Sequence, residues 1–298
     1  MAEENADLFS KLPEEILVSI ITSFTMNEAA RFSLVSRQCE VVWRYFPVLI
    51  FEDCKAKEKV WNSWDAIFED RASFVRRVDR VLEKHLGTTI DELRITFDLE
   101  RSWQSNVDKW VAFALDKQLK RLEHNFSTIY RGIYLPRYDG QLLNPPPKLT
   151  GFKSCLTSLC LRHVNVTDEF IDYLPHSCPL LEMLCIEGSS YLTRVTGALS
   201  VKQLEVYYCP KLKKINVSAR KLHSFTLFGV FPVEVHIVDA PSLIKMSVGW
   251  GEILPHALDY LSDILSQLVY LKISLDLGLP IMVCASSLPH FLFNTVLT

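Results

Sequence analysis

Histidine and cysteine are the residues of this sequence that most often carry chemistry, and their spacing predicts no catalytic site. His163, His236 and His256 lie in separate parts of the chain, and no motif places a nucleophile beside any of them. The G-x-S-x-G, P-loop, H-E-x-x-H and glycine-rich dinucleotide motifs are missing from the sequence. We therefore expect no catalytic residue, no metal and no cofactor, and a protein that is not itself an enzyme.

The eight cysteines are even in number and would suit four disulfides in a secreted protein. However, Met1 to Lys11 is acidic and lacks the apolar segment of a signal peptide. The cysteines form no C-x-x-C pair, and the histidines do not have zinc-site spacing. The sequence therefore favours reduced thiols, and by the same reasoning unmodified N-x-S/T triplets at Asn125, Asn165 and Asn216.

Composition indicates a globular chain with about two domains. Of the 298 residues, 49% are hydrophobic and 22% are charged, and the formal net charge is −3. This balance gives no general reason to bind nucleic acid or an anionic membrane, and no apolar run is long enough to span a bilayer. We expect neither nucleic acid nor a membrane among the partners.

The elements that could position a binding site begin with residues 8–51, which have the pattern of three short helices. Pro13 suits a first helical position and is followed by two glutamates in the first turn. Asn27 and Ser36 are the expected N-caps of the second and third helices. Since about forty residues bury too little surface to be stable alone, this segment is expected to need a partner.

Residues 52–89 predict a charged helical connector. Apolar residues recur at helical spacing between Phe74 and Leu86, and basic residues such as Arg76 and Arg80 are expected to face water. Gly87 is placed where a helix C′ glycine belongs.

From Ile90 onward, a repeated L-x-x-L-x-L unit predicts a leucine-rich-repeat solenoid. First positions from Leu156 differ by 25, 20, 21, 21 and 25 residues, which lies within the range of about 20 to 29 for such repeats. The expected fold class is therefore α/β, with an N-terminal three-helix segment followed by a solenoid that contains a curved parallel sheet. The units begin at Ile90, Leu156, Leu181, Val201, Leu222, Leu243 and Leu268.

The connections between the units predict a mixed convex layer. A weaker unit at Leu119 follows a helical stripe from Val107 to Leu115, which would cover the back of the sheet. Residues 212–217 and 233–237 predict extended convex segments, whereas residues 168–174 and 257–265 have helical spacing. Pro145 to Pro147 predict a loop.

The order of Leu12-Pro13, Ile16-Leu17, Ile20, Phe24, Leu34-Val35-Ser36-Arg37, Trp43 and Pro47 resembles an F-box. The remaining segments, such as FVRRVDRVLEKH, VDKWVAFALDK and SCPLLEMLCIEG, are similar to plant F-box proteins with leucine-rich repeats, of the FBD-associated type. The resemblance implies a flexible N-terminus at 1–8, an F-box at 9–51, the helical connector at 52–89 and repeats at 90–298. Since that family commonly continues into further repeats, the solenoid is expected to be truncated at its C-terminus.

The resemblance implies the substrate-recognition subunit of an SCF-type ubiquitin ligase, located in the cytoplasm or the nucleus. Its F-box would bind a Skp-type adaptor and through it a cullin scaffold, and its repeats would bind an unknown target protein. Members often carry a Pro and a Trp where this chain has Thr25 and Cys39, so the alternative is a leucine-rich-repeat scaffold without ubiquitination activity. The adaptor-binding positions that carry over are Leu12, Pro13, Ile16, Leu17, Ile20, Val35 and Trp43.

Strand alternation predicts a target surface. The second and third apolar residues of each unit should face the core, so the residues before, between and after them should face the concave side. Aromatic residues there are informative because they are enriched at binding hot spots, although they would also be explained by packing on neighbouring strands. The predicted target-binding residues are Arg162, Glu187, Glu205, Tyr207, Phe228, Lys245, Tyr270 and Lys272.

Overall fold

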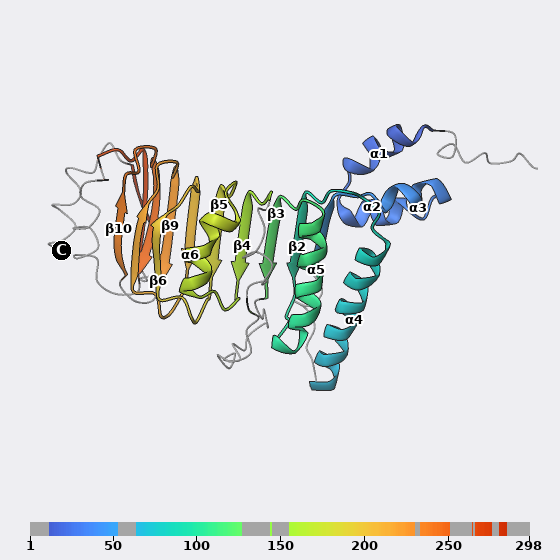
Figure 1. The fold of residues 1–298 in the computed structure, drawn as a ribbon, viewed down its shortest axis with the longest axis horizontal. Coiled ribbons are helices and arrows are strands. Elements are labelled where there is room, and N and C mark those ends of the chain that lie inside the picture. The colour runs from blue at the N-terminus through green and yellow to red at the C-terminus, as the bar shows by residue number, and fades with distance from the viewer. Residues whose placement is uncertain are drawn as a thin grey trace, which may run out of the picture.

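The computed structural model describes residues 12–52, 64–126, 144, 155–229, 233–250, 264, 266–275 and 280–284. Three short helices lie at one end of a long sheet whose strands stand side by side (Figure 1). The helices are α1 (Glu14–Thr22), α2 (Met26–Phe32) and α3 (Arg37–Trp43). The strand order is β1-β2-β3-β4-β5-β7-β9-β11-β12-β13, and every pair is parallel except β12 with β13. The α/β fold class is confirmed.

The strands of this sheet coincide with the repeated unit. Each strand from β2 to β12 carries two core-facing positions, and register brings equal positions of successive units together, as in Leu159↔Leu184↔Leu204. Because equal positions of neighbouring units lie side by side, their buried side chains form continuous rows along the core. The strands are β1 (Val48–Glu52), β2 (Glu92–Thr96), β3 (Arg121–Asn125), β4 (Ser158–Arg162), β5 (Met183–Glu187), β7 (Gln203–Tyr207), β9 (Ser224–Gly229), β11 (Lys245–Trp250), β12 (Tyr270–Leu275) and β13 (Pro280–Cys284).

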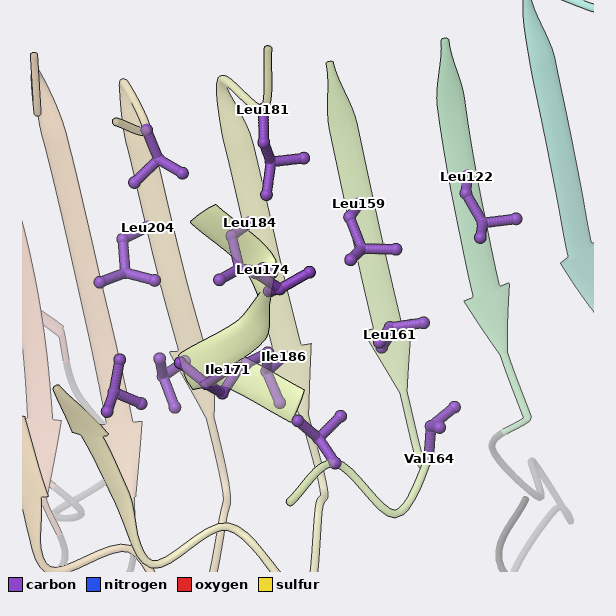
Figure 2. Close-up of a cluster of buried hydrophobic side chains, with 14 of the residues drawn as sticks. Leu122, Leu159, Leu161, Val164, Ile171, Leu174, Leu181, Leu184, Ile186 and Leu204 are labelled. Atoms are coloured by element: carbon purple, nitrogen blue, oxygen red, sulfur yellow. The ribbon is translucent and has the colours of Figure 1, made fainter. Parts of the chain in front are cut away.

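The convex layer changes from helices to strands along the molecule. Helices α4 (Trp64–Lys84), α5 (Gln104–Asp116) and α6 (Asp168–Ser177) cover the N-terminal half, with a short 3-10 turn, η2 (Arg101–Trp103), before α5. In Figure 2, Ile171 and Leu174 of α6 point toward Leu184 and Ile186 of β5. A second parallel sheet, β10-β8-β6, covers the C-terminal half; its strands are β6 (Arg194–Ala198), β8 (Lys214–Ser218) and β10 (Glu234–Val238).

The predicted extended segments at 212–217 and 233–237 are therefore confirmed as parts of β8 and β10. Strand β6 was not predicted, because Arg194–Ala198 contains one large apolar side chain, Val195, which is buried. The predicted loop at Pro145–Pro147 lies outside the described residues, as does the predicted helix at 257–265 apart from Ile264.

The connector contains α4, which ends at Lys84, three residues before Gly87. The prediction that Gly87 is a C′ glycine is wrong, because its φ is not positive. A Cβ at Gly87 would lie 2.7 Å from the His85 ring, so glycine is explained by the close approach of that ring.

A buried ion pair fixes α4 to the chain that follows β2. The Arg71 guanidinium lies 2.9 Å from an Asp98 carboxylate oxygen and donates a second bond of 2.9 Å to the Asp98 carbonyl. Glu100 provides another carboxylate, 3.1 Å from Arg71. Because charged groups are costly to bury without partners, this geometry holds α4 in one position.

Candidate functional site

Side-chain caps set the boundaries of the three N-terminal helices. Thr25 caps α2 in a capping box with Glu28, whose carboxylate accepts a 2.8 Å bond from the Thr25 backbone N–H. Ser36 caps α3 and accepts a 3.1 Å bond from the Cys39 N–H. The prediction for Ser36 is confirmed, whereas Asn27 lies inside α2 and is not a cap. The Thr25-x-x-Glu28 spacing is the capping-box signature, and it was the sequence signal that would have identified Thr25 as the cap.

These helices enclose a small core separate from that of the solenoid. Leu17, Ile21 and Cys39 are buried at its centre, and α1 and α3 pack on each other around them. Cys39 and the capping residue Thr25 thus contribute to the structure of the helices. The other buried apolar members are Ala29, Phe32, Val42 and Phe46.

Outside this core, α1, α3 and the turns that follow α2 and α3 expose large apolar side chains. Leu34 is 85% exposed, Val35 51% and Ile16 48%. Such exposure is costly in water unless a partner covers it. We call this group, completed by three further side chains, the helical apolar surface; its members are Ile16, Val18, Leu34, Val35, Val41 and Tyr45.

Some of the predicted adaptor-binding residues are exposed, and the others are partly or fully buried in the helical core. Pro13, Ile16 and Val35 are exposed. Leu12, Ile20 and Trp43 are partly buried and pack against the helical core, and Leu17 is fully buried in it. Sequence reasoning assigned no binding role to Leu34, Val18, Val41 or Tyr45. Val18 and Val41 lie next to buried residues of α1 and α3, whereas Leu34 and Tyr45 follow the ends of α2 and α3, where helical spacing identifies no exposed face.

A groove of about 480 Å³ borders this surface between α3 and the end of α4. Its wall includes Leu34 and Trp43, while Arg37, Arg44 and Lys84 give it a basic rim. Glu40 lies within the groove and pairs with Arg44 at 2.8 Å. The surface therefore combines apolar area with an excess of positive charge.

Backbone hydrogen bonds join the helical domain firmly to the sheet. The Pro47 carbonyl accepts a 2.8 Å bond from the Asp91 N–H, and the Arg44 carbonyl accepts a 2.7 Å bond from the Leu86 N–H. His85 Nε2 lies 3.1 Å from the Phe46 carbonyl oxygen, and burial lowers the pKa of His85. Strand β1 continues directly from these helices and pairs with β2. The junction therefore fixes the helical apolar surface relative to the sheet.

The sheet face opposite the convex layer, called the concave face, carries three rows of side chains. Register places Cys160, Cys185 and Glu205 in the middle row, and Arg162, Glu187 and Tyr207 in a neighbouring row. The alternation predicted from sequence is confirmed, since the residues between these rows are buried. All eight predicted target-binding residues lie on this face; their role in binding stays a prediction.

In the N-terminal half of the concave face, arginine and glutamate side chains form ion pairs in which opposite charges neutralise one another. Arg94 lies 2.9 Å from a Glu92 carboxylate oxygen and 3.1 Å from one of Glu123, and Arg121 pairs with Glu92 at 3.0 Å. Burial disfavours the charged form of Arg94, but the surrounding carboxylates outweigh it and raise the pKa of Arg94. Arg162 and Glu187 continue the series at 3.4 Å.

Two cysteines form the floor between these ion pairs and the C-terminal half. Cys160 and Cys185 lie opposite each other on β4 and β5, and both are buried. A hydrogen bond from Cys185, assisted by the Arg162 charge, lowers the pKa of the Cys160 thiol, while the same bond and burial raise the pKa of Cys185. Free thiols are carried by Cys39, Cys155, Cys160, Cys178, Cys185 and Cys209.

The C-terminal half of the concave face is aromatic. The Tyr207 and Phe228 rings stack with centres 5.8 Å apart and planes 10° apart. Burial, with the neighbouring Glu205 carboxylate adding to it, raises the pKa of Tyr207 to about 12. Lys272 Nζ lies 5.9 Å from the Phe228 ring centre. The stack explains part of the burial of these aromatic residues, as the alternative interpretation predicted, and both side chains remain half-buried.

The histidines highlighted by the sequence do not form a catalytic group. His236 Nε2 lies 2.8 Å from Glu234 on the convex sheet, and His163 lies 4.0 Å from Glu187. His256 lies outside the described residues. Within the part of the chain that the structure describes, no group of three or more His, Cys, Asp or Glu residues could hold a metal ion. None of the helices described here has the length and apolar character needed to cross a membrane.

The parallel strands, their repeat-by-repeat register and the convex layer define a leucine-rich-repeat solenoid joined to a small helical domain. Residues 9–51 match the family model of the F-box domain, and residues 141–280 match a family model described as "At1g61320/AtMIF1, LRR domain". The chain therefore carries an F-box and a leucine-rich-repeat domain, which is the architecture of the F-box/LRR proteins.

Three relatives in Arabidopsis thaliana have the F-box in their names, and two of these names also include the leucine-rich repeat. The chain is 24% identical over 220 residues to the putative F-box/LRR-repeat protein At4g15060, covering 68% of this chain and 49% of that protein. It is 27% identical over 256 residues to the FBD-associated F-box protein At5g56380, covering 80% of this chain and 55% of that protein. The chain is 26% identical over 237 residues to the F-box/FBD/LRR-repeat protein At1g13570, covering 72% of this chain and 54% of that protein. The chain spans about half the length of these curated relatives.

Proposed function

We propose that this protein is the substrate-recognition subunit of an SCF-type ubiquitin ligase, located in the cytoplasm or the nucleus. Its F-box binds a Skp-type adaptor and through it a cullin scaffold, and its concave face binds a target protein. The presence of F-box and leucine-rich-repeat domains supports a substrate adaptor without catalysis of its own.

The observation that carries this proposal is the helical apolar surface. The helical domain has a complete core, yet Leu34, Val35 and Ile16 remain largely exposed on it. Hydrophobic burial against a partner would remove this exposed area from water. The position of the surface, on the domain that matches the F-box model, favours an adaptor as that partner.

The junction gives the proposed function a mechanism. Since hydrogen bonds join the helical domain to β1 and β2, an adaptor on one end and a target on the concave face would be held at a fixed separation. Holding a target lysine near a ubiquitin thioester raises its effective concentration, which is the contribution of a receptor that performs no bond chemistry itself.

The test is co-purification of the full chain with a Skp-type adaptor. Leu34→Ser combined with Val35→Ser should weaken adaptor binding at least tenfold, because removing large side chains at the centre of an interface typically costs about 2 kcal/mol or more. The matched control is Tyr173→Ser combined with Leu180→Ser, which removes two side chains of 59% and 57% exposure from the solenoid.

The control should bind the adaptor as the unmodified chain does. Failure of the unmodified chain to bind any Skp-type adaptor would instead support the scaffold without ubiquitination activity. Equal adaptor binding by the two double variants would show that the helical apolar surface is not the adaptor site.

A further inference from the structure

The two halves of the concave face differ in whether their charges are paired. Arg94, Arg121 and Arg162, in the N-terminal half, each have a carboxylate partner within 3.4 Å. In the C-terminal half, Lys245 and Lys272 form no ion pair with any described residue. This half therefore presents positive charge that the described part of the protein leaves without a counter-charge.

The two lysines lie close enough to act on one ligand. Lys245 belongs to β11 and Lys272 to β12, and register pairs Lys245 with Tyr270 and Lys272 with Ser247. Neighbouring strands are about 4.8 Å apart, so both ammonium groups can reach the same space above the sheet. Ser247 places a hydroxyl group in the row that contains Lys272, and Thr226 of the same row is buried.

The Glu205 carboxylate, on the same half of the face, already accepts hydrogen bonds from neighbouring side chains. Glu205 accepts a 2.6 Å bond from the Gln203 amide and a 3.3 Å bond from the Tyr207 hydroxyl. It lies three strands from Lys272, which corresponds to roughly 14 Å across the sheet. The surface around the lysines therefore presents ammonium and hydroxyl groups beside a flat aromatic stack.

We propose that this surface binds an extended acidic segment of the target protein. Aspartate or glutamate carboxylates of the segment pair with Lys245 and Lys272, and a neighbouring apolar side chain packs on the Tyr207–Phe228 stack. Charge complementarity selects the acidic partner, and the half-buried Tyr207 and Phe228 rings provide apolar area beside the lysines. The inference rests on the proposed function, since it names the class of target that the receptor recognises.

The experiment selects random peptides displayed on phage against the immobilised full chain and measures the affinity of the enriched peptides by fluorescence anisotropy. Lys245→Gln combined with Lys272→Gln removes both charges, and Lys245→Arg combined with Lys272→Arg retains them. The matched control is Lys213→Gln combined with Lys221→Gln, which removes two exposed lysines outside the concave face. Adaptor capture by each variant is measured separately, so that a failure of the F-box function is distinguished from a failure of this inference.

We expect enriched peptides to be rich in Asp and Glu and to bind less tightly as salt increases. The glutamine pair at 245 and 272 should weaken their binding about tenfold, because two exposed ion pairs are lost, whereas the arginine pair and the control should not. Enrichment of peptides without excess acid, no enrichment at all, or an equal loss in the control would overturn the proposal. Tighter binding of a single-stranded oligonucleotide than of the selected peptides would also overturn it, in favour of a nucleic-acid ligand.

Discussion

His124 should make the solenoid sensitive to acid. It occupies a core-facing position of β3, where register places it between Ile95 and Leu161, and it is 1% exposed. Its Nε2 has no hydrogen-bond partner among the described residues. Burial lowers the pKa of His124 to about 3, so the ring is neutral in the folded protein at ordinary pH.

The pKa of His124 is lower in the folded chain than in the unfolded chain, and this difference sets the sign of the pH dependence. Between the pKa of an unfolded histidine, about 6.5, and the folded value, the unfolded chain binds a proton that the folded chain rejects. His124 therefore leaves stability intact above about pH 6.5 and reduces it as the pH falls toward the folded pKa. Each pH unit corresponds to about 1.4 kcal/mol, so the loss at pH 5 is roughly 2 kcal/mol.

His124→Leu tests this reasoning. Urea unfolding at pH 7.5 and pH 5 should show that the variant loses roughly 2 kcal/mol less than the unmodified chain on acidification. At pH 7.5, the variant should be at least as stable, because leucine removes an unsatisfied buried nitrogen that costs about 1 kcal/mol or more. His223→Gln, at an exposed position, is the control and should retain the full acid loss. An identical acid loss in His124→Leu and the unmodified chain would refute a neutral, buried His124.

Two further substitutions test the packing that positions the candidate site. Asp98→Ala leaves the buried Arg71 guanidinium without its main partner and should lower the free energy of unfolding by about 3 kcal/mol. Replacing Arg71 by Met and Asp98 by Leu together should lower it by less. If the double variant loses as much stability as Asp98→Ala or more, an unpaired charge is not the cause. Leu17→Ala opens the helical core and should cost the helical domain about 3 kcal/mol. Hydrogen exchange should then accelerate in α1–α3 but not in β7–β11, and uniform acceleration would show that the two cores unfold together.

Much of the solenoid was predictable because its pattern is local. In a strand, successive side chains point to opposite faces, so the spacing of Leu159 and Leu161 alone identifies the core side and places Arg162 on the other. The repeat length then predicts that equal positions stack, and the Leu159↔Leu184 pair confirms it. Cap signals were less secure: Ser36 was correct, but Thr25 rather than Asn27 begins α2.

The candidate site required tertiary contacts that no spacing specifies. Ile16 and Leu17 are adjacent in an apolar run, and only the packing of α1 against α3 decides that Leu17 is buried and Ile16 exposed. Likewise, the sequence indicated that Arg162 and Lys272 share a face, whereas cross-strand neighbours decide that the first has a carboxylate partner and the second does not have one among the described residues.

The sequence by itself thus determined the class of fold, the apolar face of each strand and the set of residues that could form the concave surface, because these depend on the period of side chains along one segment. The tertiary structure decided that β1 joins the sheet and that the F-box is fixed to it by the Pro47 and Arg44 carbonyls. It also decided that, among the described residues, Lys245 and Lys272 have no carboxylate partner on the concave face. These features depend on which segments lie side by side, and the free energy of such contacts is set by register, burial and charge across the chain.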